Sequence, residues 1–285
     1  MSPRPLRIAA VLIAVALAAC APQDEPSTPA ASADTGCAPS KLATVAAGKL
    51  TVATDDPAYP PWVADNKPES GDGFESAVAY AVAAKLGYAK DQVVWTRVTF
   101  NSAIAPGRKA FDFDINQFSI TEERRNAVDF SSAYYDVAQT VITIKGSKID
   151  GAKTLAALKN AKLGAQVGTT SYRAITEVIK PATAPAVFNN NDDAKQQLGN
   201  GTVDGIVVDL PTAFFMTAAE LDNGVIVGQV PQPSGQPEQF ALVLDKGSPL
   251  TACVSRAVDA LRQDGTLTSL QAKWLAGVSG APTLG

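Results

Sequence analysis

The chain of 285 residues contains no histidine, and its 24 lysines and arginines face 28 aspartates and glutamates, a formal net charge of −4 at pH 7. Without histidine, Ser-His-Asp and Cys-His catalysis and ordinary histidine-ligated zinc sites are excluded. The acidic balance argues against nucleic acid and against an anionic membrane surface as partners. Composition therefore favours a binding protein over an enzyme, and we expect neither a metal nor another cofactor.

The first residues have the pattern of an export signal. Arg4 and Arg7 precede a short apolar run over residues 8–16, which is too short to span a bilayer as a helix. Residues 17–20, Leu-Ala-Ala-Cys, resemble the bacterial lipobox, in which the cysteine is acylated. We expect a signal peptide over residues 1–19, lipid on Cys20 and a flexible tether over residues 20–40, rich in Pro, Ala, Ser and Thr. The alternative is an ordinary signal peptide cleaved nearby.

Loss of this segment has two consequences. Without Arg4 and Arg7, 22 basic residues face 28 acidic ones, a charge of −6. With Cys20 lipidated, two cysteines remain, Cys37 and Cys253, and an even number in an exported protein indicates a disulfide. The alternative is a pair of free thiols.

Apolar periodicity predicts strands that alternate with helices. Strands are expected at residues 49–54, 93–98, 163–166, 186–188, 205–208 and 240–244, with Ile115 on a further strand and a long β-branched run at 137–144. Helices are expected at residues 74–86, 155–158, 171–179 and 192–198, from near residue 211, and at 249–274 with a break near Gly265.

This alternation predicts an α/β fold with mostly parallel sheets. The run at residues 137–144 and a proline-rich stretch at 231–237 separate two such series. A chain that leaves one lobe near residue 140 and returns near residue 238 would build lobe 1 from residues 41–140 plus 239–280. Lobe 2 would then consist of residues 141–238.

Residues 54–62, Thr-Asp-Asp-Pro-Ala-Tyr-Pro-Pro-Trp, directly follow the first expected strand. Ligands of open α/β sheets bind beyond the carboxyl ends of strands, so this loop is well placed for binding. Tyr59 and Trp62 offer flat aromatic faces to a ligand. The alternative is a rigid turn whose aromatic side chains seal the core.

Residues 112–135 combine the end of a short strand, a hydroxyl at Ser119, a helix cap at Thr121 and a guanidinium at Arg124. These groups suit a carboxylate, because a planar guanidinium can donate two parallel hydrogen bonds to it. The alternative is a surface arginine of little energetic weight, which fits Arg125 better than Arg124.

Two later segments also follow strands. In residues 166–171, Thr169 or Thr170 could bind a ligand together with the free N–H groups of a helix start, although simple helix capping is the alternative. Asp209 ends a buried strand, where a bare carboxylate is costly and a ligand ammonium would serve as its partner. Its alternative is to cap the helix that begins at Leu210.

Taken in this order, the segments resemble family 3 of the bacterial extracellular solute-binding proteins, the branch that serves polar amino-acid ABC transporters. The Ser-Ile-Thr-x-x-Arg run that ends at Arg124 is the clearest signature, and the similarity covers roughly residues 48–275. The resemblance implies a two-lobed, type II periplasmic-binding-protein fold, each lobe a mostly parallel sheet flanked by helices, with the ligand in the interlobe cleft. It also implies ligand-binding roles for Asp56, Tyr59, Phe100, Ser119, Arg124, Thr170 and Asp209, to which the amides of Gln117 and Gln166 and the hydroxyl of Thr169 add three further candidates.

Within this set, the resemblance assigns the groups common to all amino acids to four residues. Arg124 and Thr170 would hold the α-carboxylate. Ser119 and Asp209 would hold the α-ammonium.

The resemblance places the ligand side chain between Tyr59 and Phe100. It leaves open whether Asp56 or its neighbour Asp55 faces the pocket. Residues 116–118, often small in the family, are Asn, Gln and Phe here.

The identity of the bound amino acid stays open. The amides of Asn116, Gln117 and Gln166 favour a polar side chain over an aliphatic one, whereas Asp56 could favour a cationic one.

The resemblance further implies a monomeric, non-enzymatic lipoprotein, anchored through Cys20 to the outer face of the cell membrane. It would bind a polar L-amino acid by lobe closure and present it to the permease of an ABC importer. One alternative is an exported lyase similar to cyclohexadienyl dehydratase, with Asp56 or Glu122 as general acid or base. Another is a ligand sensor that docks on a membrane kinase.

Overall fold

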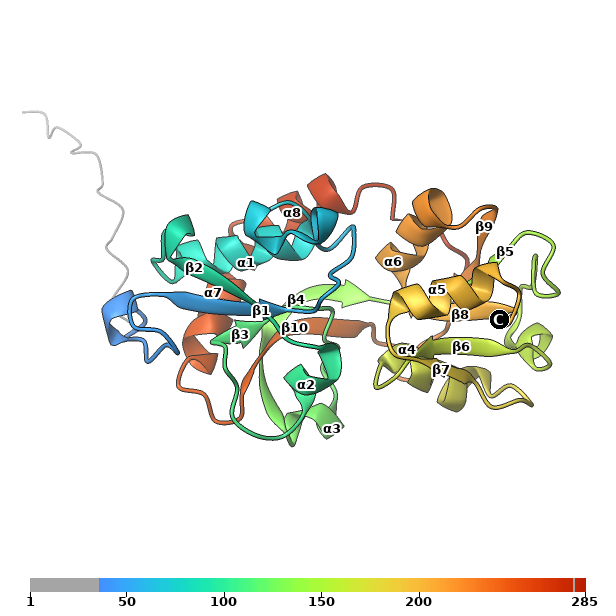
Figure 1. The fold of residues 1–285 in the computed structure, drawn as a ribbon, viewed down its shortest axis with the longest axis horizontal. Helices are drawn as coiled ribbons and strands as arrows, with labels where there is room; N and C mark the ends of the chain where they lie inside the picture. The colour runs from blue at the N-terminus through green and yellow to red at the C-terminus, as the bar shows by residue number, and fades with distance from the viewer. Residues whose placement is uncertain (1–35, 279) are drawn as a thin grey trace, which may run out of the picture. The chain divides into compact units, whose positions relative to one another are not determined.

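The computed structural model describes residues 36–278 and 280–285. These residues build two five-stranded sheets, each flanked by helices (Figure 1). The predicted signal peptide at residues 1–19, Cys20 and the tether as far as residue 35 lie outside the described residues. No helix in the described part of the chain is long and apolar enough to cross a membrane.

The first sheet and its helices form what we call the first lobe. Its strands lie in the order β2 (Val93–Arg97), β1 (Leu50–Thr54), β3 (Phe113–Asp114), β10 (Glu238–Asp245) and β4 (Val128–Val137). β1 pairs in parallel with β2 and β3, whereas β10 pairs antiparallel with β3 and β4. One face is covered by α1 (Phe74–Lys85), α7 (Thr251–Gln263) and α8 (Thr266–Trp274), and the other by α2 (Phe100–Ile104) and α3 (Glu122–Arg125).

The second lobe repeats this plan around the second sheet. Its strands lie in the order β7 (Ala186–Phe188), β6 (Leu163–Gln166), β8 (Gly205–Asp209), β5 (Gln139–Ile144) and β9 (Gly224–Gln229). β6 pairs in parallel with β7 and β8, whereas β5 pairs antiparallel with β8 and β9. Its helices are α4 (Thr170–Arg173) with a π-helical continuation (Ala174–Ile179), α5 (Asn191–Gly199), and α6 (Leu210–Phe215) with a π-helical continuation (Met216–Glu220).

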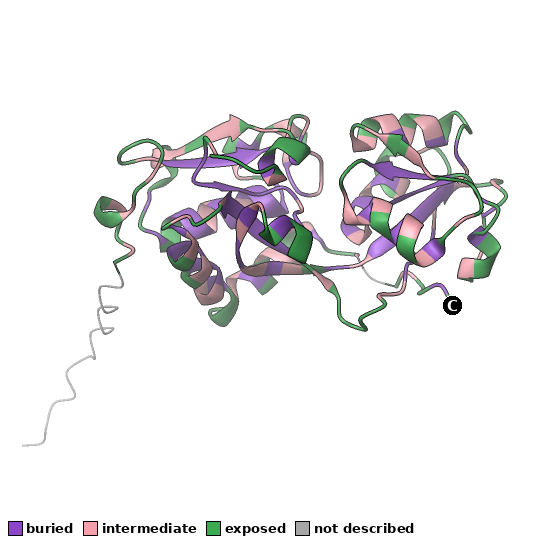
Figure 2. Cartoon of the chain, turned by 90° about the horizontal axis from the view of Figure 1, so that it is seen from below, coloured by how far each residue is buried: buried purple, intermediate pink, exposed green. Residues whose placement is uncertain are grey.

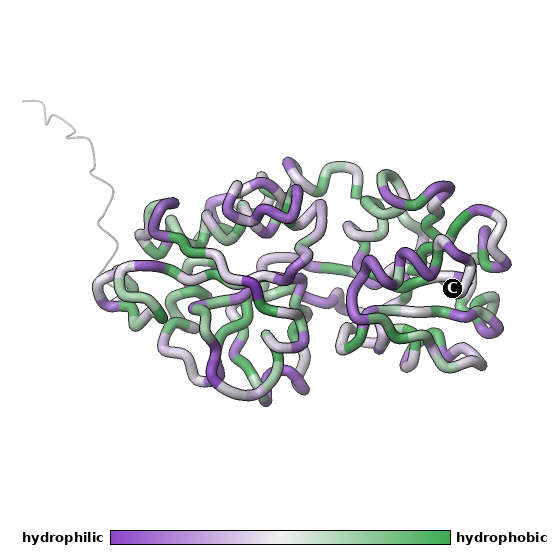
Figure 3. The backbone as a smooth tube through the Cα atoms, in the orientation of Figure 1, coloured by the Kyte–Doolittle hydropathy of each residue, from purple (hydrophilic) through white to green (hydrophobic). Residues whose placement is uncertain are grey.

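Burial is complete along the central strand β1, including the two threonines of its alternating pattern, Thr51 and Thr54. All five residues of β1 are buried, since helices cover both faces of the sheet. Figure 2 shows buried strands inside both lobes, and Figure 3 shows hydrophobic stretches of chain in both lobes. In the first lobe, the buried Trp62 ring packs 5.6 Å from Phe240 and 5.8 Å from Tyr135. Trp62 thus fulfils the core-sealing alternative for its loop.

The chain passes between the lobes where strands change sheets. β4 leads into β5 across Ala138, and β9 returns to β10 through residues 230–237. The strands that enter a sheet from the other lobe, β5 and β10, are the ones that pair antiparallel, so each sheet is mixed, with two parallel and two antiparallel pairings. The C-terminus also reaches the second lobe, because Thr283 pairs with Gln229 and Leu284 joins the second lobe's core.

Most predicted elements are present, but the expectations differ from the structure at several points. The run at residues 137–144 is the end of one strand and the whole of another, and β4 and β9 were not predicted. β4 carries polar residues and two register shifts against β10; at one of them Ser131 Oγ accepts from Leu242 N, 3.0 Å away. Such irregularities hide the alternating pattern of a strand.

Three further elements differ in detail. The expected strand at Ile115 ends one residue earlier, at Asp114. The segment Leu155–Leu158 is a 3-10 helix, and the helix expected at residues 171–179 becomes π-helical after Arg173.

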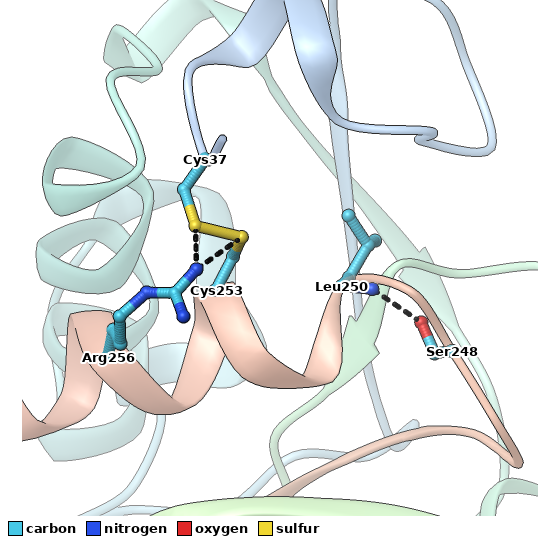
Figure 4. Close-up of a disulfide and its surroundings, with 5 residues drawn as sticks. All are labelled: Cys37, Ser248, Leu250, Cys253 and Arg256. Carbon is cyan, nitrogen blue, oxygen red and sulfur yellow. Dashed lines mark hydrogen bonds between the residues drawn. A yellow bond between two sulfur atoms is a disulfide. The ribbon is translucent and has the colours of Figure 1, made fainter. Parts of the chain in front are cut away.

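The predicted disulfide between Cys37 and Cys253 is present, with a Cα–Cα distance of 5.5 Å (Figure 4). Cys253 lies on α7, and the Arg256 guanidinium on the next turn donates to both sulfur atoms. The bond joins residues 216 positions apart, so it fixes the first described residues to the helical layer of the first lobe.

The disulfide should stabilise the fold mainly by restricting the unfolded chain. For a loop of this length, the chain-entropy relation gives an upper value of about 5 kcal/mol. Replacing both cysteines by serine should therefore lower the denaturation midpoint clearly without changing the fold, as measured by urea unfolding and circular dichroism. A variant as stable as the wild-type protein would contradict this expectation.

Candidate functional site

The candidate site is a cleft between the lobes, at the carboxyl ends of parallel strands of both sheets. Residues that follow β1 and β3 line it from one side, and residues around the ends of β6 and β8 line it from the other. Side chains from several strands converge at such edges in α/β sheets. The lining residues are Asp55, Pro57, Tyr59, Phe100, Asn116, Gln117, Arg124, Gln166, Thr169, Thr170, Ser171, Asn191, Val208 and Asp209.

The structure brings eight of the ten predicted binding residues into this lining: Tyr59, Phe100, Gln117, Arg124, Gln166, Thr169, Thr170 and Asp209. Ser119 lies behind the lining, 1% exposed, with its Oγ 3.2 Å from Thr170 Oγ1. Asp56 is exposed and accepts a hydrogen bond from Asn66 Nδ2 at 2.9 Å. Its neighbour Asp55 faces the cleft instead.

Arg124 is held in a fixed position at the first-lobe side of the cleft. Thr121 Oγ1 accepts from Arg124 N at 3.1 Å, which starts α3 at the predicted cap. The guanidinium donates to the carbonyl oxygens of Ser119 at 2.7 Å and, from the other lobe, Gly168 at 2.9 Å. Two of its five N–H donors are thus occupied, and the rest remain for a ligand. Burial lowers the pKa of Arg124 to about 10.

Aromatic side chains form the wall beside Arg124. The Phe100 ring stacks on Phe118 at 4.9 Å, and the Arg124 guanidinium lies 5.2 Å from the Phe100 ring centre. Tyr59 reaches toward the second lobe; burial, followed by the nearby Asp192 carboxylate, raises the pKa of its hydroxyl. These contacts give the cleft a rigid apolar side next to its charged one.

The two threonines on the second-lobe side have different roles. Thr169 caps α4, because its Oγ1 accepts from Tyr172 N at 3.1 Å and donates to a backbone carbonyl at the end of β6. Thr170 makes no such cap; its Oγ1 lies 3.2 Å from both Ser119 Oγ and Gln139 Nε2. Thr169 is therefore a helix cap, whereas Thr170 contacts Ser119 of the other lobe.

Asp209 lies at the end of β8, directly before α6. Its side chain does not cap that helix, so the alternative of a helix-capping role for Asp209 is wrong. The carboxylate instead accepts from Gln139 Nε2 at 2.8 Å. Burial, and after it the neighbouring Glu238 carboxylate, raises the pKa of Asp209 to about 8.

Sequence reasoning missed two polar residues behind the cleft, Gln139 and Glu238. The Gln139 amide nitrogen donates to Asp209 and, at 3.0 Å, to Glu238, while its oxygen accepts from Ser171 Oγ at 2.6 Å. Glu238 also accepts from Ser119 Oγ at 3.0 Å. Both residues begin strands that have just crossed between the lobes, and no local pattern in the sequence marks such positions.

The lobes also meet beside the cleft. Trp62 Nε1 donates to Thr212 Oγ1 at 2.9 Å, in a buried bond between the first loop and α6. Together with the bond from Arg124 to Gly168, it shows that the lobes are in contact on the cleft's rim. Within the described residues, no group of three or more metal-ligating side chains could hold a metal ion.

Comparison with known proteins agrees with this geometry. The family model of the bacterial extracellular solute-binding proteins, family 3, matches residues 50–277. An L-arginine-binding protein of Pseudomonas aeruginosa is 28% identical over 240 residues, which are 82% of this chain and 90% of that protein. The ABC transporter glutamine-binding protein of Bacillus subtilis is 28% identical over 213 residues, 73% of this chain and 75% of its own.

Solved structures show the same fold. An ancestral arginine-binding protein bound to arginine is 31% identical, with a TM-score of 0.66 over 80% of this chain and 99% of that chain. An ancestral amino acid-binding protein described as a precursor of cyclohexadienyl dehydratase is 30% identical, with a TM-score of 0.65 over 80% of this chain and 95% of that one. The chain therefore belongs to family 3 of the bacterial extracellular solute-binding proteins.

Proposed function

We propose that this protein binds a polar L-amino acid in the interlobe cleft and delivers it to the permease of an ABC importer. The observation that carries this proposal is a pair of opposite charges facing one small cleft, Arg124 from the first lobe and Asp209 from the second. A free amino acid carries the complementary pair, an α-carboxylate and an α-ammonium, on a single carbon atom.

Neither Arg124 nor Asp209 is hydrogen-bonded to an oppositely charged side chain, although the Glu238 carboxylate acts on both electrostatically. Arg124 donates to neutral carbonyl oxygens, and Asp209 accepts from a neutral amide. Burial accordingly destabilises the charged form of each, lowering the pKa of Arg124 and raising that of Asp209. A bound zwitterion would bring an opposite charge into direct contact with each group and reverse both effects.

Binding of this kind would couple to the arrangement of the lobes. Arg124 stands on the first lobe, while Thr170 and Asp209 stand on the second, so one ligand contacts both. Contacts that exist only when the lobes are together shift the population toward the closed form. The closed form would then be the one that a permease recognises.

The first-lobe and second-lobe amides support a polar ligand side chain. Asn116, Gln117 and Gln166 all line the cleft, where an aliphatic side chain would leave their hydrogen-bonding groups unpaired. The relatives named for arginine and glutamine are consistent with such a ligand.

Attachment to the membrane rests on the sequence alone. The lipobox-like residues before Cys20 support a lipid anchor at the outer face of the cell membrane. The tether of the monomeric binding domain would end before Cys37 and not at residue 40 as predicted, because the disulfide fixes Cys37 to α7 and Pro39–Lys41 form a 3-10 helix. A sensor that docks on a membrane kinase would use the same cleft and differ only in its partner.

The alternative of an exported lyase has no support from the positions of its proposed acid or base. Asp56 and Glu122 are absent from the cleft lining, and the Glu122 side chain is 94% exposed. General acid or base chemistry requires hydrogen-bond reach of the substrate.

The ligand should first be identified by a thermal-shift screen of the twenty amino acids. A ligand at 100 times its dissociation constant stabilises the folded state by about 2.7 kcal/mol, which such a screen detects. A polar amino acid is expected to give the largest shift. A screen in which none of the twenty raises the midpoint would contradict the proposal.

Arg124→Ala should weaken binding of that amino acid by about 30-fold or more in titration calorimetry, because the bound carboxylate would lose its charged partner. Arg125→Ala is the matched control. Arg125 lies next to it on α3, is exposed and pairs only loosely with Glu122, 3.6 Å away. Equal affinities in the two variants would rule out the role of Arg124.

Affinity should depend on pH through Asp209. Its raised pKa of about 8 means that the carboxyl is protonated at lower pH and must lose its proton to face an ammonium. Affinity should therefore fall as the pH is lowered from 8 toward 6, by up to about tenfold per unit, with proton release on binding. Asp209→Asn should bind more weakly at pH 8 and lose most of this pH dependence; an unchanged slope would argue against the assignment.

A further inference from the structure

A buried carboxylate outside the cleft lining, Glu75, contacts the loop that forms one end of the cleft. Glu75 lies in the first turn of α1 and is 0% exposed. The loop after β3 carries Asn116 and Gln117, which line the cleft. Glu75 therefore connects the helical layer of the first lobe to the binding residues without facing the ligand.

The Glu75 carboxylate accepts three hydrogen bonds. Oε1 accepts from Gln117 N at 2.7 Å and from the Tyr134 hydroxyl, and Oε2 accepts from Gln117 Nε2. Two of these three donors belong to one residue. Glu75 thus holds both the backbone and the side chain of Gln117.

These hydrogen bonds hold Gln117 in an unfavourable backbone conformation. Gln117 has a φ of 47°, in the left-handed region, which is unfavourable for a residue other than glycine. The two bonds to Glu75 offset this cost and fix the direction of the side chain. The conformation of Gln117 therefore depends on its hydrogen bonds to Glu75.

The chemistry of an ionised carboxylate decides which way the Gln117 amide faces. A carboxylate only accepts hydrogen bonds, so the amide nitrogen must point toward Glu75, and the amide oxygen is left for the cleft. Asp55 acts similarly from the cleft lining, where the Asn116 side chain is hydrogen-bonded to it. The end of the cleft formed by the first lobe therefore presents hydrogen-bond acceptors to a ligand.

We propose that Glu75 is a positioning residue that turns the Gln117 amide oxygen into the cleft, so that the cleft selects amino acids whose side chains donate hydrogen bonds. This inference rests on the proposed function, since it concerns the side chain of the same ligand. A carboxamide, an ammonium or a guanidinium fits such an end. An acidic side chain is excluded, because an ionised carboxylate has no hydrogen to donate to these acceptors.

The first test compares matched ligands on the wild-type protein at pH 8.5, above the pKa of about 7 that burial gives Glu75. Glutamine should bind at least about tenfold more tightly than glutamate, and asparagine than aspartate, because an acidic side chain leaves the acceptors of the cleft unpaired. Tighter binding of either acidic partner would overturn the inference and leave the proposed function intact. Absence of binding by any amino acid would overturn both.

The second test changes the positioning residue itself. Glu75→Gln keeps the size of the side chain but can donate as well as accept, so the Gln117 amide can turn. The preference for glutamine over glutamate should fall by about fivefold or more. Asp112→Asn is the control: Asp112 is also buried, accepts from Val45 N and Thr51 N, lies outside the cleft, and should leave the preference unchanged.

A double-mutant cycle separates positioning from a general effect on folding. Gln117→Met removes the amide and should itself reduce the preference for glutamine over glutamate. In that background, Glu75→Gln should cause no further loss of preference, since no amide remains to be oriented. Additive effects of the two substitutions would show that Glu75 acts independently of Gln117 and would refute the assignment.

Discussion

The binding site depends on two buried ionisable groups, the Arg124 guanidinium and the Asp209 carboxyl, neither of which is hydrogen-bonded to an oppositely charged side chain. Arg124 is 8% exposed and is held by carbonyl oxygens, and Asp209 is held by an amide. Burial of a charge without a counter-charge is unfavourable, and the shifted pKa values of both groups record that cost. A cleft of this kind is complementary to a zwitterion, and the unfavourable terms in the empty protein become favourable ones in the complex.

The connections of the fold place these two groups on opposite sides of the cleft. Parallel strands end at the cleft in both lobes, which places Asp55 after β1, Gln166 at the end of β6 and Asp209 at the end of β8. The strands that cross between lobes add Gln139 and Glu238 behind the lining. The bond from Gln139 to Glu238 and the contact of Ser119 with Thr170 join the two lobes, so this polar network depends in part on the position of one lobe relative to the other, which couples the binding site to closure.

The amino-acid sequence alone was enough to predict the parts of the molecule whose cause is local. β1 shows an alternating pattern and β8 a continuous apolar run, Thr121 caps the helix that carries Arg124, and Asp209 stands at the end of its strand. β4 was missed because bulges disturb its pattern. Gln139 could not be identified because its partners lie 70 and 99 positions away. The choice between Asp55 and Asp56 depends likewise on Asn66, on another part of the loop, which binds the Asp56 carboxylate.

The central claim is that the cleft recognises both charged groups of a free amino acid. Titration calorimetry of the best ligand against its N-acetyl and α-carboxamide derivatives tests this most directly, since each derivative removes one charge and keeps the side chain. We predict that each derivative binds at least about 30-fold more weakly than the free amino acid, because a buried charge then stays unpaired. Binding of either derivative within about threefold of the free amino acid would contradict the account.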